Sequence, residues 1–148
     1  MEWIYLSPHF DDTAYSCGVL VWEQVSSGHS VSIWTICAAY PPPGPLSPFA
    51  ASLHERWGTG REAVQQRRGE DRRSSRLMGA NTRYFSIEDA IYRTSPIDGR
   101  VMYPSDQDLF AEIHPHESEL VRTLRDELAS ALSPDCELIC PLTLGGHV

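Results

Sequence analysis

The first forty residues alternate between strand and helix signals, and this order constrains the fold more than any other feature. Residues 3–7 are short, aromatic and β-branched, and they stop at Pro8. Residues 14–26 carry apolar side chains near helical spacing, and Gly28 follows where a helix C-terminal cap is expected. Residues 31–37 form a second strand-like run. Strand, helix and strand in this order predict a βαβ unit, and hence an α/β fold with a mainly parallel sheet.

The rest of the chain continues the alternation with two interruptions. We expect helices over 61–78 and 117–132, and strands over 82–87 and 137–142. Residues 40–60 contain five prolines, so we expect a long loop there without helix. Residues 90–108 are also expected to be irregular, and both loops are candidate specificity segments. With 148 residues in all, the chain is expected to form a single domain, residues 1–148.

Composition excludes several classes of function. The chain carries 20 acidic and 12 basic residues, for a net charge of -8, so binding to nucleic acid through phosphate neutralisation is not expected. All basic residues are Arg, which excludes a Lys Schiff base or a P-loop Lys within this chain. The sequence has no apolar run long enough to span a bilayer, no basic leader, and four Cys in apolar stretches. We therefore expect a cytoplasmic protein with buried thiols.

A candidate metal site directly follows the first predicted strand. The segment contains His9, Asp11 and Asp12 within four residues. His9 and Asp12, spaced i and i+3, can face one divalent ion, and Asp11 can then accept a proton from a metal-bound water. The alternative is that Asp12 simply caps the helix that follows, because Asp is a common N-cap. The added imidazole favours the metal site.

This segment resembles a known family. Pro8-His9-Phe10-Asp11-Asp12, followed by Ser16-Cys17-Gly18, resembles the P-H-x-D-D motif of the LmbE/PIG-L-like zinc deacetylases. Members of that family remove acetyl groups from N-acetylglucosamine units on glycolipids, thiol precursors or antibiotics. The resemblance implies a Rossmann-like three-layer α/β/α fold. It also implies His9 and Asp12 as metal ligands and Asp11 as the general base.

Two further regions extend the resemblance toward the substrate. The run from Gln65 to Ala80 resembles the family helix that carries R-x-x-E and ends at L-G, which implies Arg67 as a substrate-binding residue beside Glu70. The other arginines of this helix are expected on a solvated face: Arg68, Arg72, Arg73 and Arg76. Asp89 matches a substrate-side Asp of the family, although an Asp in a turn is ordinary.

The last residues resemble the family strand that is followed by G-G-H-x-D-H. His147 matches the first His of that motif, which in the family stabilises or protonates the tetrahedral intermediate. The second His, a third metal ligand in the family, would occupy position 150, so we expect the C-terminal part of the family domain to be missing. A Zn²⁺ or other divalent ion would then be weakly bound or absent. A truncated product, proteolysis, and a shift of His147 into the third ligand position all remain open.

The resemblance implies a metal-dependent hydrolase that removes an N-acetyl group from a small-molecule amino sugar or glycoconjugate. The alternative is a non-catalytic module that binds a sugar or protein through an incomplete metal site. A phosphoesterase ranks lower because it would normally need more carboxylate ligands. A dinucleotide enzyme is not expected, because the first turn has no G-x-G-x-x-G. The sequence leaves the substrate, the metal and the oligomeric state open.

Overall fold

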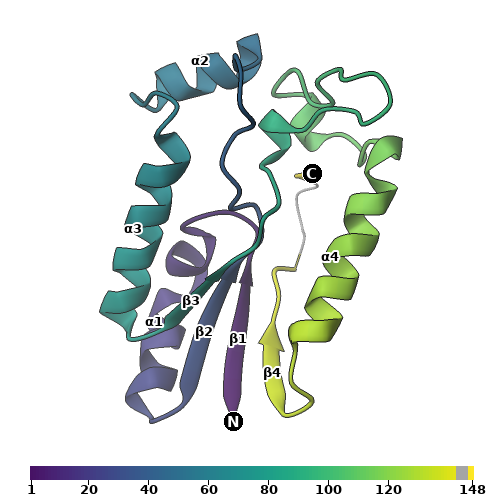
Figure 1. Ribbon diagram of the computed structural model, residues 1–148. Coiled ribbons are helices and arrows are strands. Elements are labelled where there is room, and N and C mark those ends of the chain that lie inside the picture. The colour runs from purple at the N-terminus through teal and green to yellow at the C-terminus, as the bar shows by residue number, and fades with distance from the viewer. Residues whose placement is uncertain (143–146) are drawn as a thin grey trace.

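A four-stranded parallel sheet forms the centre of the molecule. The computed structural model describes residues 1–142 and 147–148. Its strands are β1 (Glu2–Ser7), β2 (Ser30–Thr35), β3 (Asn81–Tyr84) and β4 (Cys136–Ile139). They lie in the order β3-β2-β1-β4, and each neighbouring pair is parallel (Figure 1). The α/β fold with a parallel sheet, predicted from the strand and helix order, is therefore confirmed.

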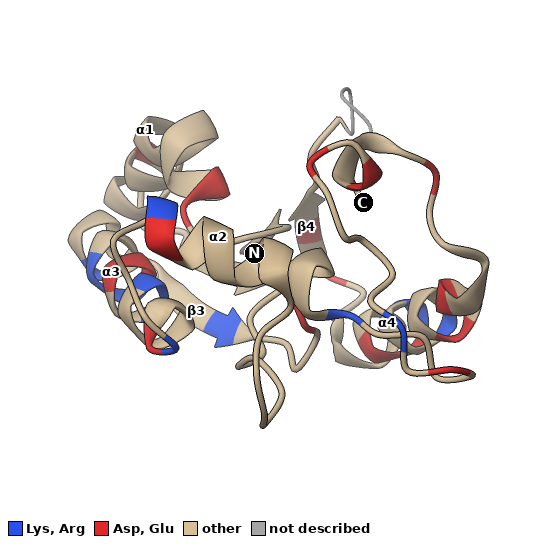
Figure 2. Ribbon diagram, turned by 90° about the horizontal axis from the view of Figure 1, so that it is seen from above, with Lys and Arg blue, Asp and Glu red and all other residues tan. Residues whose placement is uncertain are grey.

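Helices cover both faces of this sheet. The helices α1 (Asp12–Ser26) and α3 (Ala63–Met78) lie on one side, and α4 (Ser118–Ala131) lies on the other (Figures 1 and 2). Three short 3₁₀ turns, η1 (Ala90–Tyr92), η2 (Asp108–Phe110) and η3 (Pro115–Glu117), lie between β3 and α4. No helix in the described part of the chain has the length and apolar character needed to cross a membrane.

The alternation of side chains along the strands divides the core between the two faces. On β1, Tyr5 packs with Val21 of α1 on one face, whereas Ile4 packs with Trp34 on the other. Because successive strand residues point to opposite faces, one strand contributes to both helix layers. The second face is completed by two leucines of α4, Leu124 and Leu128.

A third apolar cluster lies above the carboxyl ends of the strands. It includes Phe10 from the loop after β1, Ala38 from the loop after β2, and Tyr92 from η1. Segments distant in sequence are thus packed together at the edge of the sheet where ligands bind in open parallel α/β folds. This cluster provides the floor and walls of the candidate site.

The expected long loop over residues 40–60 is wrong in its second half. The structure has a helix there, α2 (Pro48–Arg56). Pro48 occupies the first turn, where its missing N–H is not needed, and the Ser47 hydroxyl accepts a hydrogen bond from the Ala50 amide at 3.1 Å. The prolines that argued against a helix therefore end just where a capped helix begins.

The expected burial of the cysteines is correct only in part. All four are free thiols; Cys17, Cys37 and Cys136 are partly buried, but Cys140 is exposed. Cys140 directly follows β4. Because β4 lies at an edge of the sheet, its side chains are less buried than those of the inner strands.

Two valines of α1 offer a matched test of the packing. Val21 is fully buried against the sheet, whereas Val19, two residues away on the same helix, is 73% exposed. We expect Val21→Ala to lower the free energy of unfolding by about 2–3 kcal/mol through lost burial and a residual cavity. Val19→Ala should change it by less than about 0.5 kcal/mol. Urea unfolding followed by circular dichroism measures both, and equal effects would contradict the packing of α1.

Candidate active site

Hydrogen bonds at the end of β1 determine the shape of the loop that carries the motif. The Ser7 hydroxyl donates to the His9 carbonyl at 2.8 Å and accepts the Thr13 amide at 3.2 Å. The His9 amide donates to Asp12 Oδ2 at 2.8 Å. Asp12 is the first residue of α1, and its carboxylate turns back to this loop. The N-cap alternative for Asp12 is thus wrong, because the residue lies inside the helix.

Asp11 adopts a backbone conformation that side-chain-bearing residues rarely take. Its φ is 77°, and it is the only non-glycine residue with positive φ in residues 1–142 and 147–148. Asp tolerates this left-handed region better than most residues, and such strain concentrates at functional sites. The Asp11 amide donates to Asp71 Oδ1 of α3 at 3.4 Å. Asp71 is buried and also accepts the Tyr84 hydroxyl at 2.9 Å, so α3 and β3 both hold the turn in place.

The imidazole of His9 lies against the carboxylate of Asp12. Its Nδ1 atom is 3.4 Å from Asp12 Oδ2, and its Nε2 atom is 4.0 Å from Asp89 Oδ2. Burial alone would lower the pKa of His9, but the neighbouring Asp12, Cys37 and Asp89 raise it to about 10. Burial likewise opposes ionisation of Asp12, yet hydrogen bonds from the His9 ring and amide hold the pKa of Asp12 below its ordinary value.

Arg67 connects α3 to the motif. Its guanidinium lies 3.7 Å from Asp11 Oδ2 and donates to the Phe10 carbonyl at 3.3 Å. Glu70, its neighbour in the R-x-x-E pattern, accepts a hydrogen bond from Gln66 instead. Burial raises the pKa of Asp11, and the nearby carboxylates add to this effect while Arg67 opposes it.

Asp89 and His147 complete the set of residues predicted from the sequence. Asp89 caps η1 by accepting the Ile91 amide at 3.4 Å, while its other oxygen faces His9. The His147 ring lies edge-on to the His9 ring, with 5.0 Å between centroids, and burial and the charge of His9 lower the pKa of His147. Gly145 and Gly146, which precede it in the G-G-H-x-D-H resemblance, lie outside the described residues. The structure thus brings the six side chains predicted from the sequence to the carboxyl end of β1: His9, Asp11, Asp12, Arg67, Asp89 and His147.

The donor atoms fit two positions of a zinc site. Two ligands bound at about 2.0–2.1 Å around a tetrahedral ion lie about 3.4 Å apart, which is the separation of His9 Nδ1 and Asp12 Oδ2. His9 Nε2 is buried without a hydrogen-bond partner and faces a carboxylate, as the second nitrogen of metal-binding histidines commonly does. Within residues 1–142 and 147–148, no three His, Cys, Asp or Glu side chains gather closely enough to hold an ion.

Sequence reasoning missed a buried polar network behind His9. Arg93 donates to the Cys37 sulfur at 3.4 Å and to the Glu88 carbonyl at 2.8 Å, and it pairs with buried Glu117 at 3.0 Å. Tyr103 donates a short hydrogen bond to the same Glu117. These residues are spread from position 37 to position 117, so no local pattern marks them. Asp71, by contrast, lies i+4 from Arg67, and this helical spacing placed it on the face that meets the motif.

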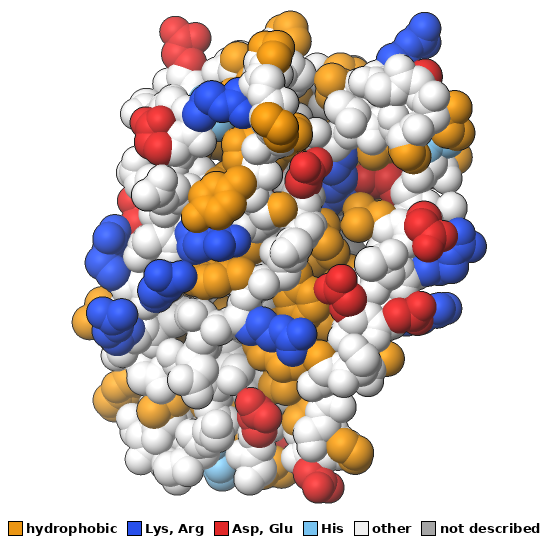
Figure 3. Space-filling view, in the orientation of Figure 1, with side chains coloured by type: hydrophobic (Ala, Val, Ile, Leu, Met, Phe, Trp, Pro, Cys, Tyr) orange, Lys and Arg blue, Asp and Glu red, His pale blue; other side chains and the backbone are white. Residues whose placement is uncertain are grey.

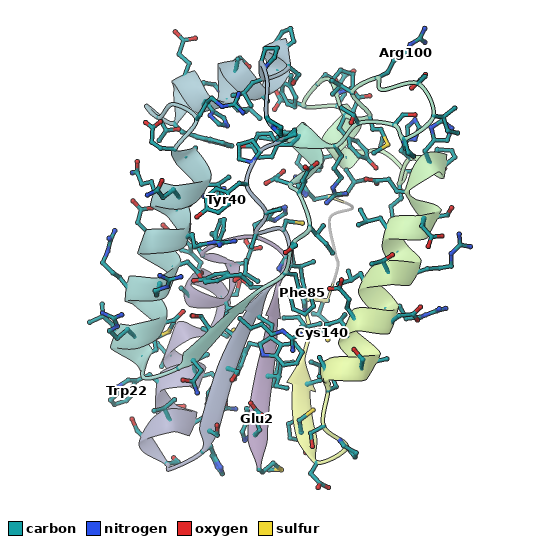
Figure 4. All side chains as sticks on the ribbon, viewed as in Figure 1. Glu2, Trp22, Tyr40, Phe85, Arg100 and Cys140 are labelled. Carbon is teal, nitrogen blue, oxygen red and sulfur yellow. The ribbon has the colours of Figure 1, made fainter. Side chains whose placement is uncertain are left out.

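Arg68 is not on a solvated face, contrary to expectation. Its guanidinium donates to the Ala38 carbonyl and lies 4.9 Å from the ring centroid of Tyr40 and 4.7 Å from that of Tyr84. Figure 4 shows Tyr40 extending toward α3, and Figure 3 shows basic side chains beside hydrophobic ones on this face. Arg68 thereby joins α3 to the loop after β2. Arg72, Arg73 and Arg76 are exposed as expected.

Comparisons with known proteins indicate the family to which this chain is related. No family model matches the chain. The 2'-N-acetylparomamine deacetylase of Niallia circulans is 32% identical over 119 residues, which are 72% of this chain and 42% of that protein. A deacetylase–teicoplanin complex from teicoplanin biosynthesis superposes with a TM-score of 0.77 at 30% identity, over 88% of this chain and 52% of that one.

The zinc-inhibited form of teicoplanin deacetylase Orf2 superposes with a TM-score of 0.72 at 28% identity, over 88% of this chain and 49% of that one. The chain therefore spans about half the length of the relatives it matches. The sequence likeness and the shared fold both point to deacetylases. On this evidence the chain belongs to the LmbE/PIG-L-type deacetylase family.

Proposed function

We propose that the protein is a metal-dependent hydrolase that removes an N-acetyl group from an amino sugar or glycoconjugate. The observation that carries the proposal is the convergence of His9, Asp11 and Asp12 with Arg67 and His147 at the carboxyl end of β1. The relatives named as deacetylases of paromamine and teicoplanin compounds support the reaction class. The substrate itself is proposed only as a class.

In this proposal His9 and Asp12 hold the divalent ion. A bound zinc ion polarises a carbonyl and lowers the pKa of water to about 7. Asp12, ionised because hydrogen bonds from His9 lower its pKa, supplies negative charge next to the imidazole. Asp89 faces the other ring nitrogen of His9 and orients the ring.

Asp11 accepts the proton of the attacking water and returns it to the leaving amine. Burial and neighbouring carboxylates raise its pKa, which makes it a better proton acceptor than an ordinary Asp. Its left-handed backbone and the Asp71 hydrogen bond aim the carboxylate before substrate binds. Such preorganisation lowers the barrier because no reorientation is needed during the reaction.

His147 and Arg67 act on the substrate itself. Burial lowers the pKa of His147, which favours the neutral imidazole, and its ring can donate one N–H to the developing oxyanion. Arg67 remains partly exposed beside Asp11, where its free N–H groups can orient sugar hydroxyls. Both residues border the loop that follows β1, and in this proposal the reacting amide binds between them.

One observation favours a second candidate function, sugar binding without turnover. In the described residues no three His, Cys, Asp or Glu side chains lie close enough to hold an ion, and a catalytic zinc normally has three protein ligands. Tight binding of an N-acetylated sugar without any acetate release in excess zinc would favour this candidate.

Replacing Asp11 tests the general base. We expect Asp11→Asn to lower kcat for acetate release by about 10²–10⁴-fold, because the amide cannot accept the proton. Acetate is measured with an N-acetylglucosaminide as substrate and zinc added. Asp126→Asn, on the exposed face of α4, serves as the matched control and should leave the rate unchanged. An unchanged rate in Asp11→Asn would refute the assignment of the base.

Replacing the two ligands tests the metal site independently of turnover. We expect His9→Ala and Asp12→Ala each to weaken zinc binding by at least about tenfold, since each removes one donor atom. Calorimetric titration with zinc measures the affinity, and a chelator should abolish acetate release until zinc is restored. His29→Ala, whose ring lies beside Trp3 rather than in the site, is the control. Equal zinc affinity in all variants would place the ion elsewhere.

A further inference from the structure

Two cavities of very different size meet at the candidate site. The inner cavity has a volume of about 10 Å³ and the outer groove about 430 Å³. Both are lined by the same three residues, Trp57, Ala63 and Arg67. These residues belong to the end of α2 and the first turns of α3, and the wall that they form borders both spaces.

The inner cavity suits a small apolar group. Its other lining residues are mainly rings, methyl groups and one thiol: Phe10, Cys37, Ala39, Val64, Asp89 and Tyr92. A volume near 10 Å³ holds about one water-sized group, which matches a methyl and leaves no room for a longer chain. Asp89 lies in this lining and also faces His9, so the cavity adjoins the proposed metal site.

The outer groove has the chemistry of a sugar site. Its remaining lining residues, Thr59, Gln66 and Glu70, offer a hydroxyl, an amide and a carboxylate beside the indole of Trp57. Ligand pockets for small molecules typically measure about 300–1,000 Å³ and combine aromatic surface with a few polar groups. Trp57 is 42% exposed, so part of its ring is available to a ligand.

Trp57 is held in place rather than free to move. Its ring lies 5.5 Å from that of His54, and the Arg67 guanidinium lies 5.7 Å from its ring centroid. His54 is itself buried and bonded at both nitrogens, to the Gly60 carbonyl at 2.7 Å and to the Tyr92 hydroxyl at 2.6 Å. Because these contacts hold the Trp57 ring, we expect it to exclude acyl groups that are larger than the inner cavity.

We propose that Trp57 determines which acyl group the site accepts. The indole closes the inner cavity so that the methyl of an acetyl group fits and a longer acyl chain does not, while its exposed part faces the sugar in the outer groove. The inference rests on the proposed deacetylase function and adds the residue that sets the acyl specificity.

The experiment compares N-acetyl and N-butyryl forms of one glucosaminide, so that contacts to the sugar cancel. The zinc-loaded wild-type protein should favour acetyl over butyryl in kcat/KM by roughly 100-fold, since added methylenes meet a closed pocket. Trp57→Ala should reduce this ratio to below about tenfold, whereas Trp57→Phe should keep most of it. Trp22→Ala is the matched control, because Trp22 is exposed on α1 at the opposite end of the sheet from α2 (Figure 4).

A binding measurement separates this inference from the proposed function. Calorimetry with both glucosaminides in the presence of a chelator reports acyl preference without turnover. One outcome is that no acyl group is released, the wild type binds the acetyl form more tightly, and Trp57→Ala loses that preference. This outcome would support the role of Trp57 in acyl preference and would contradict the deacetylase function. If acetate is released and Trp57→Ala keeps the wild-type preference in both measurements, the wall is refuted. A wild type that binds and hydrolyses both forms equally also refutes it.

Discussion

The turn that leaves β1 is the constraint on which the rest of the site depends. The Ser7 hydroxyl and the Asp12 carboxylate both bond to backbone groups of this loop, and Asp11 is held in a left-handed conformation between them. Because the loop is short and bonded at both ends, His9 and the two carboxylates have little freedom. The orientation of each side chain toward the others follows from this backbone, and the later segments of the chain pack around it.

Charge compensation explains how so many ionisable groups share a small space. Asp11 lies near Asp12 and Asp71, yet Arg67 offsets part of the repulsion and approaches from α3. Asp12 is stabilised by His9. Behind them, the largely buried Arg93 is satisfied by carboxylate, carbonyl and sulfur acceptors. Buried charges are tolerated only when they are paired in this manner. Because Arg93 is paired within this network, the charged groups available for the reaction are those of the motif and Arg67.

Local sequence patterns predicted the sheet and the motif well, because both depend on neighbours in the chain. Short runs of aromatic and β-branched residues and apolar residues at helical spacing placed every strand and three of the four α-helices of the described residues to within a few residues. The helix α2 was missed because a cluster of prolines outweighed the signal of Ser47 and Pro48, a capping residue followed by a proline in the first turn. That capping signal is local and is present in the sequence.

The sequence alone determined which chemical groups the protein carries and at which strand end the first of them lies, since strand alternation and the βαβ order follow from local periodicity. The family resemblance indicated Arg67 and Asp89, but only the tertiary structure decided how these two residues, with Asp71 and Trp57, meet the motif. These contacts join segments tens of residues apart. They exist because helices and loops pack over one edge of the sheet, and local periodicity does not specify which side chains such packing brings together.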